Sequence, residues 1–145
     1  GPAVAAGNGI SGSSPDLLYS PKGIFVDAAI NLYVADCLND RVQRFPINSS
    51  KATTVIGTGG NVQISLSCPM GLTLDKNGYI FLVDSQNSRV IGSGPNGLRC
   101  LFGCGGTVGA GPSVNSPSTL SFDSDGNIYK IDLTEMNIIK YRKVT

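Results

Sequence analysis

An internal repeat constrains this chain more than any other feature of its sequence. A proline and two aspartates recur three times at a constant interval of 48 residues, with no insertion or deletion between these markers. The recurring positions are Pro21, Pro69 and Pro117; Asp27, Asp75 and Asp123; and Asp36, Asp84 and Asp132. Repeats of this length are supersecondary units that bury their faces by stacking on one another. The repeat therefore predicts a modular architecture for nearly all of the 145 residues.

Each copy of the repeat contains short apolar runs typical of β-strands. In the first copy, residues 23–26 and 32–34 are rich in β-branched and aromatic side chains and flank a short turn, as a hairpin requires. In the later copies this turn contains Asn77-Gly78 and Asp125-Gly126, dipeptides that tolerate positive φ in tight hairpins. A third run follows at residues 41–45, 89–91 and 137–141, and a fourth at residues 53–56 and 99–102. No run has helical apolar spacing, so the sequence predicts an all-β fold.

Four short strands in a period of about 40 to 50 residues are the signature of a β-propeller blade. The order of residues resembles the NHL repeat family, whose blades read as a proline, then Gly-Ile-x-Val-Asp, then Asn-Leu-Tyr-Val-Ala-Asp, then Asn-x-Arg-Val-Gln. Residues 21–45 match this pattern almost throughout and residues 69–91 match it well, whereas the third copy has Asn137 in place of the arginine. The resemblance implies one NHL-repeat domain, residues 1–145, with three four-stranded blades. We expect these blades at about residues 17–60, 65–106 and 113–145.

Three blades do not comfortably make a ring, because closed propellers contain about four to eight. In strand order, residues 2–9 resemble a fourth strand without a blade, and the third copy ends on its third strand. An isolated arc of blades exposes two apolar faces and unpaired strand edges. We therefore expect self-association, either as a two-chain six-bladed ring, since NHL propellers usually have six blades, or as a head-to-tail filament. A third interpretation is a fragment of a longer chain.

Composition argues against several classes of partner. The formal net charge is +1 and only 14% of residues are charged, which gives no electrostatic footprint for nucleic acid or for an anionic membrane. No stretch has the roughly 20 mostly apolar residues of a spanning helix. We predict no nucleic-acid partner and no membrane partner, and we keep a protein or glycan partner open.

The four cysteines, an even number, favour disulfides and an oxidising compartment. In a propeller, the loop between the second and third strands lies on the same face as the entry to the next blade, so we pair Cys37 with Cys68. Elimination leaves Cys100 with Cys104, which lie roughly 13 Å apart in a regular strand, beyond the roughly 7 Å limit for a disulfide. This pair needs a bulge or turn at Gly103, or both thiols are free. The alternative for the whole set is four reduced thiols.

The sequence also contains an acceptor pattern for N-linked glycosylation. Asn48-Ser49-Ser50 lies between the third and fourth strands of the first copy, in a predicted surface loop. Such a modification fits a secreted protein. Asn48 is therefore the predicted glycosylation site of an extracellular, disulfide-bonded glycoprotein.

No catalytic constellation stands out. The chain has no histidine, which removes Ser-His and Cys-His pairs and the commonest zinc ligand. Lyases and lactonase-like propellers resemble this family in fold, but they use histidine or an acidic metal site. We interpret the recurring aspartates, with Arg41 and Arg89, as structural residues that hold turns and one another. Lys130 replaces the Val34 and Leu82 of the other copies, so we expect this position to be less completely buried than its two equivalents.

The sequence therefore predicts no catalytic residue, no metal site and no cofactor. It favours a non-catalytic extracellular structural or interaction module that self-assembles through open blade edges. The first alternative is a propeller scaffold that binds a protein or a small ligand on its loop face. A distant alternative is a calcium-dependent lactonase-like hydrolase, because the aspartates recur at strand ends.

Overall fold

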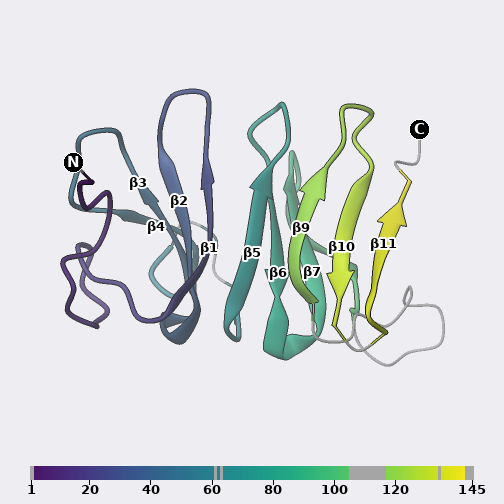
Figure 1. Cartoon of the computed structure of the whole chain (residues 1–145), viewed down its shortest axis with the longest axis horizontal. Coiled ribbons are helices and arrows are strands. Elements are labelled where there is room, and N and C mark those ends of the chain that lie inside the picture. The colour runs from purple at the N-terminus through teal and green to yellow at the C-terminus, as the bar shows by residue number, and fades with distance from the viewer. Residues whose placement is uncertain (1, 61, 63, 105–116, 134, 143–145) are drawn as a thin grey trace.

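The computed structural model describes residues 2–60, 62, 64–104, 117–133 and 135–142. Within these residues the chain forms eleven β-strands in three antiparallel sheets, with two short 3-10 helices. Figure 1 shows the sheets standing side by side along the long axis of the chain. The prediction of an all-β fold is confirmed.

The three sheets follow one another along the sequence, and we call them blades 1, 2 and 3. Blade 1 contains, in spatial order, β1 (Pro21–Val26), β2 (Leu32–Asp36), β3 (Arg41–Phe45) and β4 (Thr53–Gly57). Blade 2 contains β5 (Pro69–Leu74), β6 (Ile80–Asp84), β7 (Arg89–Gly94) and β8 (Gly97–Phe102). Blade 3 contains β9 (Pro117–Phe122), β10 (Ile128–Asp132) and β11 (Asn137–Tyr141). The helices η1 (Cys37–Asn39) and η2 (Ser85–Asn87) join the second and third strands of blades 1 and 2.

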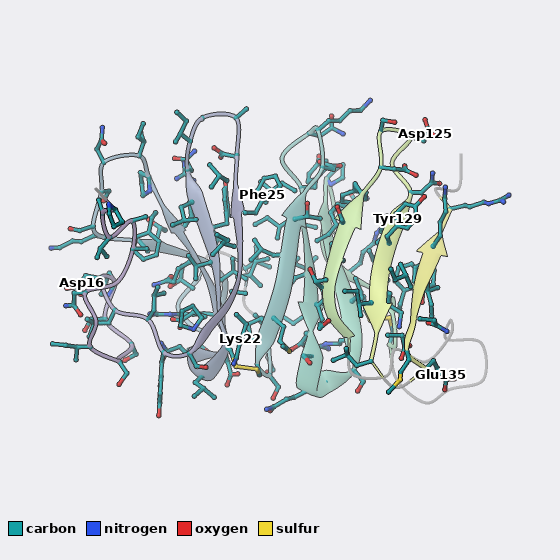
Figure 2. All side chains as sticks on the ribbon, viewed as in Figure 1. Asp16, Lys22, Phe25, Asp125, Tyr129 and Glu135 are labelled. Atoms are coloured by element: carbon teal, nitrogen blue, oxygen red, sulfur yellow. A yellow bond between two sulfur atoms is a disulfide. The ribbon has the colours of Figure 1, made fainter. Side chains whose placement is uncertain are left out.

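The blades pack face to face and share two apolar cores. Side chains from both blades form the first core, between blades 1 and 2: Phe25, Tyr33, Ala35, Val42 and Ile56 from the one, and Leu72, Leu82 and Ile91 from the other. In Figure 2, Phe25 lies between β1 and β5. The second core lies between blades 2 and 3, where Val83 and Val90 pack with Leu120. The repeat therefore works as expected, since each blade buries a face against its neighbour.

The expected fourth strand at residues 2–9 is not formed in this chain. A β-strand needs the hydrogen-bonding edge of a partner strand, and no sheet edge of the described chain receives this segment. Residues 4–7 lie instead on the side of blade 1 that points away from blade 2, where they help to line a hollow.

Candidate functional site: the repeat motif and the two open blade faces

Asp36 organises the entry into blade 1. Its buried carboxylate accepts hydrogen bonds from the backbone N–H of Tyr19 at 2.7 Å and from Asn39 Nδ2 and Arg41 Nε, both at 2.8 Å. The guanidinium of Arg41 also donates to three carbonyl oxygens in residues 13–17. One buried ion pair therefore fixes the second strand, the third strand and the connection that precedes the blade.

Blade 2 repeats this arrangement around Asp84. The carboxylate accepts hydrogen bonds from the backbone N–H of Ser67 at 2.7 Å, from Asn87 Nδ2 at 2.8 Å and from Arg89 Nε at 2.6 Å. Arg89 also donates to the carbonyl oxygen of Ser65. The interpretation of these aspartates and arginines as structural residues is confirmed by their partners.

The other recurring aspartates hold the first hairpin turn of each blade. In all three, carboxylate Oδ1 accepts from the backbone N–H groups two and four residues later, at 2.8–3.1 Å. These aspartates are Asp27, Asp75 and Asp123. Their shared role is an Asx turn, in which the side chain imitates a backbone acceptor.

Blade 3 holds its aspartate in a different way. Asn137 replaces the arginine, and Lys130 Nζ donates instead to Asp132 Oδ2 at 2.9 Å. The side chains of Lys130 and Asp132 are 0% and 2% exposed. The expectation that this position is less buried than Val34 and Leu82 is therefore wrong, and the charge is tolerated because a carboxylate neutralises it. Lys130 supplies the cation that Asn137 lacks.

Sequence reasoning noted the two departures in blade 3 separately and missed the link between them. A cation is lost at position 137 and one is gained at position 130, within a single copy of the repeat. That coincidence was the available signal.

The four cysteines form two disulfides, one between Cys37 and Cys68 and one between Cys100 and Cys104. Cys37 begins η1 and Cys68 directly precedes β5, so the first disulfide joins neighbouring blades, and it is visible between β1 and β5 in Figure 2. In the second disulfide the Cα atoms are 5.7 Å apart. The two Cα atoms lie closer together than in a regular strand because of a register shift between β7 and β8 and a positive φ at Gly103.

Asn48, the predicted glycosylation site, lies in the exposed loop between β3 and β4. Its backbone has φ +59°, a left-handed conformation that asparagine tolerates better than most residues. The loop also forms one rim of the hollow on blade 1.

The head face is the face of blade 1 that points away from blade 2, and it carries Ile24, Val26, Ile30, Leu32 and Phe45. A hollow of about 640 Å³ lies over it, lined also by residues 4–7 and 46–50. Ile24, Val26 and Ile30 are exposed although all three are apolar. Water therefore covers an apolar surface, at a cost of roughly 25 cal/mol per Å² relative to burial.

The tail face is the face of blade 3 that points away from blade 2, and it carries Tyr129, Ile131, Ile138 and Lys140. Ile138 is exposed. Beside it, Lys140 Nζ lies 5.1 Å from the centroid of the Tyr129 ring and 3.3 Å from Asp123 Oδ2. The Tyr129 hydroxyl donates to the same carboxylate at 3.1 Å. Figure 2 shows Tyr129 on β10.

These hydrogen bonds shift two pKa values on the tail face. The Asn127 side chain donates to Asp123 and holds the pKa of that carboxyl well below its ordinary value of 3.8. The pKa of Lys140 is raised by its interaction with Tyr129 and, to a smaller extent, by its interaction with Asp123. Both groups are therefore charged at neutral pH, and the tail face has a polar cluster beside its apolar part.

The described residues contain neither a cluster of metal-binding side chains nor a membrane-spanning helix. No group of three or more His, Cys, Asp or Glu side chains is placed to hold a metal ion. No helix in this part of the chain is both long and apolar enough to cross a membrane.

The sequence matches no protein-family model, and no curated protein is significantly similar to it. The fold, in contrast, is similar to several solved structures. Virginiamycin B lyase from Staphylococcus aureus superposes with a TM-score of 0.58 at 13% identity, over 86% of this chain and 42% of the lyase. A protein of unknown function from Bacteroides thetaiotaomicron gives 0.65 at 16% identity, over 77% of this chain and 32% of that one. A gluconolactonase from Xanthomonas campestris gives 0.61 at 18% identity, over 81% and 36%.

The chain thus spans about two fifths or less of the length of these structures. At such identities the likeness shows the fold alone. It confirms a β-propeller architecture of four-stranded blades, with three blades in this chain, whereas membership in the NHL family stays a prediction.

Proposed function

We propose that this chain is a non-catalytic, extracellular structural module of NHL type, which associates with further copies of itself through the head face and the tail face. The observation that carries the proposal is the unequal burial of equivalent residues in the three blades. Each open face has the same chemistry as a face that another blade covers elsewhere in the molecule.

The head face repeats a surface that is covered in the other two blades. Leu72 packs against blade 1 and Leu120 packs against blade 2, and each is 5% exposed. Ile24 occupies the equivalent position in blade 1 and is 68% exposed. A second blade placed there would bury Ile24 and its neighbour Val26, at about 1.5–3 kcal/mol for each side chain that becomes fully buried.

The tail face repeats the surface that normally receives the next blade. Val42 and Val90 are 0% and 1% exposed because the following blade covers them. Ile138, at the equivalent position, is 69% exposed. The polar cluster also has a counterpart in a covered junction, since Tyr33 interacts with Asp27 and Arg44 in blade 1 and is nevertheless buried.

The head and tail faces are different surfaces of one chain, so a contact between them is heterologous. Such contacts form a ring when the rotation closes and a filament when it does not. Both outcomes bury the same two faces, and the geometry of the first strands decides between them.

Thr119 favours the open filament. The first strands approach so closely that a Cβ at Gly23 would collide with the Met70 carbonyl oxygen. A Cβ at Gly71 would lie 2.6 Å from Thr119 Cα. The equivalent position on β9 is Thr119, an exposed residue. The threonine side chain keeps the first strand of a second copy further from β9. The angle between the two blades is therefore smaller, which opposes closure into a ring of six blades.

Other features support the extracellular and non-catalytic parts of the proposal. Two disulfides are typical of proteins from oxidising compartments, and Asn48 is exposed for glycosylation. The sequence has no histidine, and the recurring aspartates are occupied with turns and arginines.

Sedimentation velocity tests the proposal with two charge substitutions. Ile138→Glu places a carboxylate in the centre of the tail face, and Leu38→Glu is the matched control on η1, where the leucine is exposed and lies outside both faces. We expect the wild type and Leu38→Glu to sediment as species heavier than 15.0 kDa, and Ile138→Glu to sediment as a monomer. A monomeric wild type, or an Ile138→Glu variant that assembles normally, would refute the proposal.

A further inference from the structure

The fourth strands of blades 1 and 2 end at glycines, because the start of the third strand leaves no room for a side chain there. Gly57 ends β4 with φ +101°, and a Cβ there would lie 2.5 Å from the Asp40 carbonyl oxygen. Gly103 follows β8 with φ +72°, and its Cβ would collide with the Ser88 carbonyl oxygen. Glycine is thus needed where the fourth strand meets the start of the third strand.

Gly7 has the same backbone conformation without that contact. Its φ is +74°, and Gly9 at +86° likewise matches Gly59 at +85°. A Cβ at Gly7 would meet only the Leu18 side chain, at 3.5 Å. Residues 3–7 therefore end as a fourth strand ends, although the described chain has no third strand next to them.

The segment also lies where the fourth strand of a preceding blade would lie. Residues 4–7 line the hollow together with Ile24 and Val26 of the head face. In the junction between blades 1 and 2, Val55 and Ile56 of β4 pack in the core that contains Leu72. Leu72 is equivalent to Ile24, so both segments face the same part of the next blade, β4 in a packed core and residues 4–7 across a hollow.

The outer edge of β11 is shaped to receive such a strand. In the described residues β11 pairs only with β10. The residue before β11, Met136, has φ +50°, as do Asp40 before β3 and Ser88 before β7. The backbone that accommodates Gly57 and Gly103 is thus present in blade 3 as well.

We propose that residues 3–6 of one copy add to β11 of a second copy as the fourth strand of its blade 3. This inference rests on the proposed self-association and names the strand that is exchanged. The register follows from that of β3 and β4, where Arg41 pairs with Gly57, Val42 with Ile56 and Gln43 with Thr54. The equivalent pairs are Asn137 with Gly7, Ile138 with Ala6 and Ile139 with Val4, with a bulge at Ala5. Alanines have low strand propensity, so the segment becomes a strand only on the partner edge.

Disulfide trapping tests this register. The variant Ala6→Cys/Ile138→Cys places two thiols on paired residues, whose Cα atoms lie about 4.5–5.5 Å apart, within the range for a disulfide. After oxidation we expect covalent multiples of 15.0 kDa on a denaturing, non-reducing gel, with peptide mapping that joins positions 6 and 138. The control Ala6→Cys/Leu38→Cys should stay at the mass of one chain.

A second pair of variants separates the strand contact from backbone strain. Gly7→Val and Gly9→Val both place a side chain at positive φ, but a Cβ at Gly9 has no atom within 4 Å. We expect Gly7→Val to weaken assembly at least tenfold by sedimentation and Gly9→Val to assemble as the wild type does.

The outcomes distinguish this inference from the proposed function. An assembling wild type with no 6–138 cross-link, or with a cross-link inside one chain, would overturn the strand exchange and leave the face contact standing. Normal assembly of Gly7→Val would do the same. A wild type that stays monomeric at all concentrations would overturn both.

Discussion

The buried ion pair of blade 3 leads to a prediction about the free energy of unfolding. The aspartate–arginine pairs of blades 1 and 2 provide the comparison. Lys130 and Asp132 are joined at 2.9 Å and their side chains are 0% and 2% exposed. Lys130→Leu restores the apolar residue of the repeat but removes the cation from the Asp132 carboxylate, which keeps the hydrogen bond from the Glu135 backbone N–H. Leucine and the lysine stem bury similar amounts of hydrocarbon, so the loss comes from the charge. Removing one partner of a buried pair costs about 3–5 kcal/mol, and we expect this decrease in the free energy of unfolding.

The rescue variant makes this prediction specific. Lys130→Leu/Asn137→Arg reproduces the arrangement of blades 1 and 2, where the arginine Nε lies 2.8 and 2.6 Å from the aspartate. We expect the double variant to recover most of the lost free energy. Guanidinium denaturation under non-reducing conditions, followed by circular dichroism, provides the four values of the mutant cycle. The reasoning is refuted if Lys130→Leu costs less than about 1 kcal/mol, or if Asn137→Arg is equally destabilising in both backgrounds.

Two further predictions concern the disulfide between blades and the acid stability of a turn. The Cys37–Cys68 bond closes a sequence separation of 31 residues, so Cys37→Ser/Cys68→Ser should lower the free energy of unfolding by about 3–4 kcal/mol in chemical denaturation; an unchanged midpoint would contradict this. Asn127 lowers the folded-state pKa of Asp123, so the stability from this carboxylate is present above its ordinary value of 3.8 and is lost as the pH falls below it. NMR titration should show the Asp123 pKa rising toward 3.8 in Asn127→Ala, and an unmoved pKa would exclude Asn127 as the cause.

Much of the architecture could be predicted because the repeat is regular. The aspartates recur at one interval, and each carboxylate has the geometry to fix a turn or an arginine wherever it appears. Asp36 and Asp84 therefore have equivalent partners, each an asparagine and an arginine at the same spacing. Local chemistry of this kind depends on short sequence distances, which a linear pattern preserves.

The remaining features depend on which surfaces meet in space. Ile24 and Leu72 are equivalent and both apolar, yet one is exposed and the other buried, because within the described residues Leu72 has a preceding blade against it and Ile24 does not. Residues 2–9 have the pattern of a strand but no partner edge in the described chain, so they do not become one. The burial of Lys130 also depends on a neighbour, because its partner Asp132 lies beside it on β10. The repeat pattern of the sequence does not show which of these residues a neighbouring strand or side chain will cover.

Hydroxyl-radical footprinting over a range of protein concentrations tests the central claim most directly. The label reports how exposed each side chain is, and it can follow Ile24 on the head face, Ile138 on the tail face and Leu38 as an exposed reference. If two copies join head to tail, labelling of Ile24 and Ile138 falls together as the concentration rises, while that of Leu38 stays constant. Constant labelling of Ile24 and Ile138 at every concentration would contradict the account.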